Sequence, residues 1–199
     1  MAVKEKDSLL PMCTVSSATS KLRPNQLNVQ CTRLSRQKRI TIRTRKMVNN
    51  NIIFLDLDGV LLTDMHERGR RAHPPALSSL NKVIEEFDCK VVIISDIRKL
   101  HDGVAELRRL CIDPVEHEHD LRGLDPKRIV GATPVLNNTR GSEISEWLDT
   151  FGQRYEPMKY VVIDDNADLA PHLHSHVHID TYDGFTEIDA ECVRALLRD

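Results

Sequence analysis

The stretch "IIFLDLDGVLL", residues 52–62, decides the fold class, because its apolar run ends in two aspartates two positions apart and then a glycine. An apolar run without polar alternation predicts a strand that is buried on both faces of a parallel sheet. Two similar runs follow, "KVVIISD" at 90–96 and "KYVVIDD" at 159–165. We therefore expect three central strands, each of which ends in polar residues.

Amphipathic helices are expected between these strands. Apolar residues recur three or four positions apart in the segments 76–87, 100–110 and 141–151. The short runs "RIVGAT" and "HVHID" are expected to add edge strands, and "EIDAECVRALLR" a closing helix. This alternation predicts an α/β fold with a doubly wound, Rossmann-like, mostly parallel sheet.

The beginning of the chain differs in composition from the rest. Residues 1–46 hold eleven Lys and Arg against two Asp and Glu, whereas the remainder holds seventeen against twenty-eight. The first segment also has no sustained apolar period, which predicts a disordered basic arm ahead of one globular domain at 47–199. Three interpretations of the arm stay open: a nucleic-acid-binding tail, an organelle-targeting peptide, or sequence upstream of a true start at Met47.

Several protein classes are excluded by composition. No run of about 18 apolar residues is present, and the first residues do not resemble a secretory signal. The five cysteines are scattered and never form a C-x-x-C pair, so we expect neither a disulfide framework nor a zinc site. The sequence favours a cytoplasmic protein, with organelle targeting by the arm as the alternative.

The three strand ends are expected to meet in one acidic pocket, because ligands of doubly wound folds bind beyond the carboxyl ends of the strands. These ends supply Asp56, Ser95, Asp96, Asp164 and Asp165. Any one of them is explained as a turn or helix cap. Capping does not explain why so many acidic residues gather in one place, since two like charges ~4 Å apart cost ~4 kcal/mol at an effective dielectric of ~20. A cation or a proton is expected among them, and an oxygen-only ligand set suits Mg²⁺.

Four motifs together resemble those of the haloacid dehalogenase (HAD) superfamily, whose members are mostly phosphatases that form an aspartyl-phosphate. "FLDLDGVL" resembles the first motif, D-x-D-G-V, and "VVIIS" the second. Arg140, at the start of a predicted helix, fills the third motif, with Lys127 and Arg128 as competitors. "VVIDDNAD" is similar to the acidic fourth motif. More narrowly, "RGSEISEWL" followed by "YVVIDDNADLAPHL" is similar to the HAD domain of "Swiss Army Knife" RNA-repair proteins.

The resemblance implies roles for the first-motif residues. Asp56 would attack phosphorus as the nucleophile, and Asp58 would protonate the leaving oxygen and then activate water. The main-chain carbonyl of Asp58 would face the metal, and Gly59 would allow the backbone to turn away and open the pocket.

The resemblance also implies a phosphate site and a metal site. Ser95 and Arg140 would bind the phosphoryl group. Mg²⁺ would be held by the aspartates of the first and fourth motifs: Asp56, Asp58, Asp164 and Asp165. Asp164 is favoured over Asp165 because Asp164-x-x-x-Asp168 matches the acidic spacing of the superfamily. One departure is Ser95-Asp96-Ile97-Arg98, which adds an acid where relatives usually carry Ser-Trp-Arg.

The implied function is Mg²⁺-dependent hydrolysis of a phosphomonoester, with terminal phosphates of nucleic acid, RNA in particular, as the substrate. The alternatives are a small-molecule phosphatase, a phosphotransferase, and an idle module that binds Mg²⁺ or a partner, although binding alone does not require both Asp56 and Asp58.

An uncapped pocket is expected, because 37 positions from Asp58 to Ser95 and 24 from Arg140 to Asp164 leave no room for a cap domain. The segment "MHERGRRAHPP", 65–75, is a predicted flap. The segment holds three arginines that would contact a phosphate backbone: Arg68, Arg70 and Arg71. The alternative is a solvated basic loop.

Two histidine-rich segments stand outside these motifs. "PHLHSHVHID" places His172, His174, His176 and His178 at alternate positions, which on a strand would put four imidazoles on one face and could bind a transition metal. Pro171 and the preceding acidic turn instead favour a loop or helix end, and hence a surface cluster without metal. "VEHEHD", 115–120, is interpreted in the same way.

Overall fold

The computed structural model describes residues 50–199, apart from residues 102, 115–118, 137 and 157. The basic arm, 1–46, lies outside the described residues, so its boundary and its three interpretations stay predictions. None of the helices in the described part of the chain combines the length and the apolar character that crossing a membrane requires.

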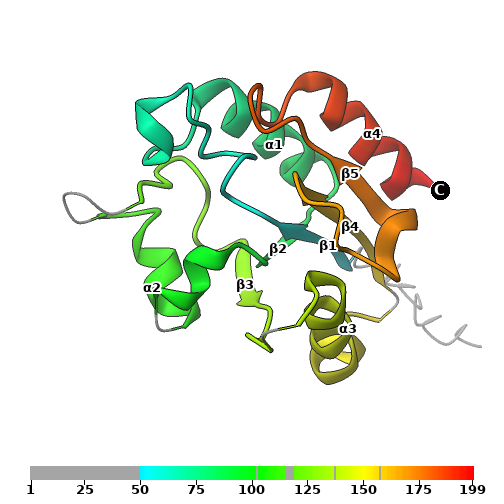
Figure 1. Ribbon diagram of the computed structural model, residues 1–199. Helices are drawn as coiled ribbons and strands as arrows, with labels where there is room; N and C mark the ends of the chain where they lie inside the picture. Colours follow the sequence, from blue (N-terminus) through cyan, green and yellow to red (C-terminus); the bar gives the residue numbers. More distant parts are fainter. Residues whose placement is uncertain (1–49, 102, 115–118, 137, 157) are drawn as a thin grey trace, which may run out of the picture. The chain divides into compact units, whose positions relative to one another are not determined.

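The described residues form one five-stranded parallel sheet with the strand order β3-β2-β1-β4-β5 (Figure 1). Its strands are β1 (Asn50–Leu55), β2 (Lys90–Ile93), β3 (Ile129–Ala132), β4 (Met158–Asp164) and β5 (His176–His178). The three apolar runs occupy the centre and the two short runs the edges. The predicted doubly wound sheet is therefore confirmed.

The described residues also form four α-helices and four 3₁₀ helices, all of which lie between strands except α4, which follows β5. The α-helices are α1 (Pro74–Glu86), α2 (Val104–Arg109), α3 (Arg140–Phe151) and α4 (Glu187–Arg198). The 3₁₀ helices are η1 (Glu67–Gly69), η2 (Asp96–Lys99), η3 (Gly152–Tyr155) and η4 (His172–Ser175). As expected, no cap domain is inserted among the described residues after the first motif or between the third and fourth.

Alternate residues of the central strands build two cores, one on each face of the sheet. Ile53 and Leu55 of β1 point toward α1 and α4, whereas Ile52 and Phe54 point toward α3. Figure 1 shows α1 and α4 on one side of the sheet and α3 on the other. Trp147 of α3 is 2% exposed and meets Phe54 edge to face, so it belongs to the core on this face of the sheet.

The predicted helix at 100–110 is wrong in its extent. The 3₁₀ helix η2 ends at Lys99, before the predicted range, and α2 begins only at Val104. Gly103, directly before α2, has a φ of 87°, a left-handed value that does not fit within a right-handed helix. The apolar period continues across this residue, which explains why the pattern suggested one longer helix.

The histidine segment at 172–178 combines a helix end with a strand, as the interpretation of Pro171 suggested. The predicted surface cluster is wrong for His172, which is 5% exposed. Its ring nitrogens lie 2.9 Å from the Ser145 hydroxyl and 2.9 Å from the Tyr160 hydroxyl. Among the described residues, the one group with three potential metal ligands contains no histidine. Residues 115–118 of the second segment lie outside the described residues.

Candidate active site

The register of the central strands places the motif residues at one edge of the sheet. Leu55 of β1 pairs with Ile93 of β2 on one side and with Ile163 of β4 on the other. The backbone N–H of Asp56 donates to the Ile163 carbonyl at 2.9 Å, which extends this register by one residue. The residues that follow the three strands therefore emerge together, as the sequence predicts.

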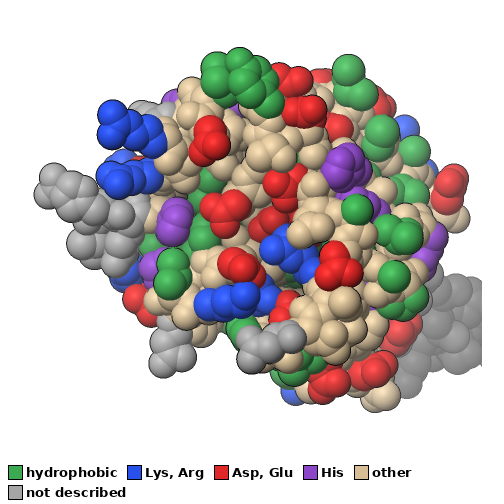
Figure 2. Space-filling view, viewed as in Figure 1, with side chains coloured by type: hydrophobic (Ala, Val, Ile, Leu, Met, Phe, Trp, Pro, Cys, Tyr) green, Lys and Arg blue, Asp and Glu red, His purple; other side chains and the backbone are tan. Residues whose placement is uncertain are grey.

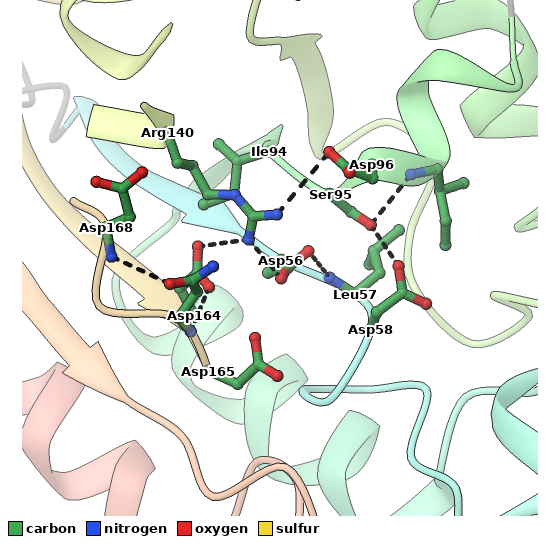
Figure 3. Close-up of polar contacts among 12 residues, drawn as sticks. Asp56, Leu57, Asp58, Ile94, Ser95, Asp96, Arg140, Asp164, Asp165 and Asp168 are labelled. Atoms are coloured by element: carbon green, nitrogen blue, oxygen red, sulfur yellow. Dashed lines mark hydrogen bonds and ion pairs between the residues drawn. The ribbon is translucent and has the colours of Figure 1, made fainter. Parts of the chain in front are cut away.

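Arg140 lies between the carboxylates of the first and fourth motifs. Its Nη1 is 2.6 Å from Asp56 Oδ2 and 2.8 Å from Asp164 Oδ2, and its Nη2 is 4.0 Å from Asp96 Oδ1 (Figure 3). Arg140 is the first residue of α3, and the Thr139 side chain caps this helix by accepting a hydrogen bond from the Ser142 N–H. The start of α3 thus delivers a cation to the strand ends.

The competitors for the third-motif position lie elsewhere. Arg128 pairs with Asp88, which precedes β2, so its guanidinium lies at the amino end of this strand. Lys127 is its exposed neighbour. Of the three basic residues considered, Arg140 is the one that the structure brings to Asp56.

The proton-transfer candidate Asp58 contacts the second motif. The Ser95 hydroxyl donates to Asp58 Oδ2 at 3.0 Å, and it accepts a hydrogen bond from the Ile97 N–H at 3.3 Å. Ser95 is fully buried, whereas Asp58 is exposed. A carboxyl group in this place can exchange protons with water.

The turn after the first motif requires glycine. Gly59 has a φ of 71°, and a Cβ at this position would lie 2.3 Å from Asp165 Oδ2. The predicted departure of the backbone at Gly59 is therefore present, and it lets Asp165 approach closely. The Thr181 hydroxyl donates to the same Asp165 oxygen at 3.1 Å.

Three carboxylates gather at the strand ends. Asp56, Asp164 and Asp165 each offer an oxygen atom, and these atoms lie within 4.8 Å of one another. Burial raises the pKa of Asp56 to about 7 and also raises the pKa of Asp164, while Arg140 opposes both shifts. Burial lowers the pKa of Arg140, but the two carboxylates outweigh it and raise the pKa overall. One guanidinium thus pairs with two of these three carboxylates, Asp56 and Asp164.

This donor set fits Mg²⁺, which prefers carboxylate oxygens and usually needs only a few of them from the protein. Both fourth-motif candidates, Asp164 and Asp165, belong to the group. The Asp58 side chain does not, and the contact expected from its main-chain carbonyl stays a prediction.

A cavity of about 460 Å³ opens beside these residues. Its lining includes Asp58 and Asp165 from the motifs, and three basic side chains: Arg68, Arg70 and His119. Arg71, the third predicted arginine of the flap, pairs with Asp120 at 3.5 Å and does not line this cavity. Figure 2 shows acidic side chains at the centre of this face with Lys and Arg side chains around them.

Residues 52–190 match the family described as the HAD domain in Swiss Army Knife RNA repair proteins. The chain belongs to this family. No curated protein matches it significantly. Family membership confirms the resemblance deduced from the motifs. It supports a phosphatase-like hydrolase as the general class of activity. HAD proteins generally use Mg²⁺, and the group of three carboxylates is consistent with this metal.

Sequence reasoning missed several residues of this HAD domain's cavity, among them His119 and Thr181. His119 belongs to a segment that was interpreted as a surface cluster, and Thr181 follows the last strand outside any motif. No sequence signal connects either residue with the first motif, because only the folded chain brings them beside Asp58 and Asp165.

Proposed function

We propose that the protein is a Mg²⁺-dependent phosphomonoester hydrolase that works through an aspartyl-phosphate on Asp56. The observation that carries this proposal is the contact between Asp56 Oδ2 and Arg140 Nη1 at 2.6 Å, inside a group of three carboxylates. It supplies a nucleophile and a cation that neutralises the charge developing on a phosphoryl group.

In the first half-reaction, an Asp56 carboxylate oxygen attacks phosphorus, and the bond from phosphorus to the leaving oxygen breaks. Asp58 in its protonated form gives its proton to that oxygen. The Ser95 hydroxyl, 3.0 Å from Asp58 Oδ2, holds the carboxyl group in place. Arg140 stabilises the charge on the transferred group.

In the second half-reaction, Asp58 as a carboxylate takes a proton from water, which attacks phosphorus. The bond between phosphorus and the Asp56 oxygen breaks, which restores the carboxylate and releases phosphate. Bound Mg²⁺, held by Asp56, Asp164 and Asp165, would offset the repulsion between the nucleophile and the phosphate.

The proposed substrate is a terminal phosphate of a nucleic acid, with RNA favoured by the description of the family. The open cavity supports this choice, because contacts outside the reacting centre must supply affinity when no cap closes over the ligand. Arg68, Arg70 and His119 provide basic groups on its wall.

The proposal is tested by phosphate release from p-nitrophenyl phosphate with Mg²⁺ and with a chelator. We expect phosphate release only when Mg²⁺ is present and not with the chelator. Asp58→Asn should lose most of its turnover at an unchanged melting temperature, since this change removes proton transfer and not packing. Transfer of phosphate to an added alcohol in preference to water would identify a phosphotransferase. No release under any condition would favour an idle binding module.

A further inference from the structure

A buried ion pair lies behind the candidate site, outside the residues that line its cavity. Arg98 of η2 and Glu143 of α3 are 8% and 4% exposed, and Arg98 Nη2 donates to Glu143 Oε2. Glu143 lies one helical turn after Arg140 on the same helix. The pair therefore joins the segment that follows Ser95 to the helix that carries Arg140.

Arg98 also holds the ends of two strands. Its Nη1 donates to the carbonyl oxygens of Ile94 and Ser95, the latter at 2.6 Å, and its Nε donates to the Thr133 carbonyl at 3.2 Å. These three carbonyls directly follow β2 and β3. One guanidinium thus binds the backbone at the carboxyl ends of both strands.

Glu143 makes the corresponding contacts on the helix side. One carboxylate oxygen accepts from Arg98, and the other accepts from the backbone N–H of Leu136 at 2.9 Å. Leu136 belongs to the segment between β3 and α3. Both oxygens of this buried carboxylate are therefore bonded, as a buried charge requires.

This arrangement constrains two groups of the candidate site at once. The Ser95 carbonyl is bound by Arg98, while the Ser95 hydroxyl donates to Asp58. Arg140 reaches Asp56 and Asp164 from the first turn of α3, so its guanidinium moves with that end of the helix. A shift of this turn would change the spacing between the cation and the nucleophile.

We propose that the Arg98–Glu143 pair is a positioning device that fixes the start of α3 against the ends of β2 and β3, and thereby sets Arg140 and Ser95 for reaction. Buried ion pairs often add no stability over apolar pairs of similar size, so their place beside a site is better explained by geometry. The catalytic part of this inference rests on the proposed function.

The first test compares two arginines that have the same exposed fraction as whole residues. Arg194 is also 8% exposed, but it bonds Glu86, Glu187 and Glu191 in the network of α1 and α4, across the sheet from α3. With p-nitrophenyl phosphate and Mg²⁺, below the melting temperature of every variant, Arg98→Met should lower kcat on the order of 100-fold with KM within about threefold. Arg194→Met should lower the melting temperature but leave kcat within about twofold. Equal losses of kcat in both variants would overturn the inference.

The second test asks whether the pair acts through Arg140. Glu143→Gln keeps the volume of the side chain and removes its charge. It should lower kcat in the wild-type background and add little to the loss in Arg140→Ala, since residues that act as a unit are not additive. A full multiplicative loss in the double variant would contradict positioning through Arg140.

A third measurement does not depend on turnover. The Nε–H resonance of Arg140, assigned with Arg140→Lys, should shift or broaden in Glu143→Gln and stay unchanged in Arg194→Met. An unchanged resonance in Glu143→Gln would overturn the inference even for an active enzyme. If the wild-type protein hydrolyses no phosphoester, the proposed function fails. The Arg140 resonance would still show whether the Arg98–Glu143 pair positions Arg140.

Discussion

Arg140 Nη1 lies 2.6 Å from Asp56 Oδ2, although the two residues are 84 positions apart in the chain. The contact joins the beginning of α3 to the end of β1. Because both side chains are largely withdrawn from water, their charges are weakly screened and the contact is strong. The proposed catalysis depends on this contact.

Removal of the Arg140 guanidinium should therefore impair catalysis more than binding. We expect Arg140→Ala to lower kcat by about 10²- to 10³-fold, as for other groups that stabilise transition-state charge. Arg140→Lys should retain part of the activity because it keeps the charge but loses the planar fork. Steady-state kinetics on p-nitrophenyl phosphate measure both, with Arg128→Ala as the control. Comparable losses in Arg128→Ala and Arg140→Ala would contradict the assignment.

Gly59 should tolerate no side chain. Gly59→Ala combines a left-handed φ of 71° with a Cβ that would lie 2.3 Å from Asp165 Oδ2, so we expect about 1–3 kcal/mol of lost stability and a large loss of kcat. Gly103 is the matched control, since its φ is 87° and, among the described residues other than its chain neighbours, no atom lies within 4 Å of an added Cβ. Gly103→Ala should lose stability from backbone strain and keep its kcat. Denaturant unfolding and kinetics on both variants separate the two effects.

His172 should make stability fall in mild acid. Burial lowers the pKa of His172, so the folded state disfavours its charged form relative to the unfolded chain, where the pKa is about 6.5. The contribution of His172 to the free energy of unfolding is fully present above the pKa of the unfolded chain. It is lost as the pH falls through the lower pKa of the folded state. His172→Gln should flatten the dependence of the melting temperature between about pH 7 and pH 5.

The control for His172 is its exposed neighbour His174. His174→Gln should keep the wild-type dependence on pH, because the His174 side chain is exposed and is surrounded by water in the folded and the unfolded chain alike. If the melting temperature of His172→Gln depends on pH as in the wild-type protein, another group causes the loss of stability in acid.

The basic wall of the cavity should select polymers. We expect kcat/KM for a 3′- or 5′-phosphorylated oligonucleotide to exceed that for the matching mononucleotide. Arg68→Ala combined with Arg70→Ala should reduce this ratio and weaken its dependence on salt. Arg71→Ala, at the arginine that pairs with Asp120, should change the ratio less. A mononucleotide that is hydrolysed as well as the oligomer, with no change in the double variant, would leave a generic small-molecule phosphatase.

The sheet and the strand-end residues could be predicted from the sequence because both follow from local patterns. Buried parallel strands are continuous apolar runs, and their carboxyl ends share one edge, so Asp56, Ser95 and Asp164 had to emerge together. The helix α3 was expected because apolar residues recur three or four positions apart in the segment 141–151.

The remaining features depend on packing that no local pattern encodes. The apolar period continued across Gly103, so the pattern did not reveal the left-handed φ directly before α2. The Arg98–Glu143 pair joins residues 45 positions apart, and its burial is visible only once α3 lies on the sheet. For the same reason the sequence did not distinguish buried His172 from its exposed neighbours.

The activity of Asp56→Asn with Mg²⁺ tests the aspartyl-phosphate mechanism most directly. The wild-type protein should release phosphate from p-nitrophenyl phosphate and, after acid quench, carry a phosphoryl group on the peptide that contains Asp56. Asp56→Asn should lose both signals while circular dichroism shows an intact fold, because the amide lacks the carboxylate nucleophile. Turnover by Asp56→Asn at the wild-type rate would contradict the aspartyl-phosphate mechanism.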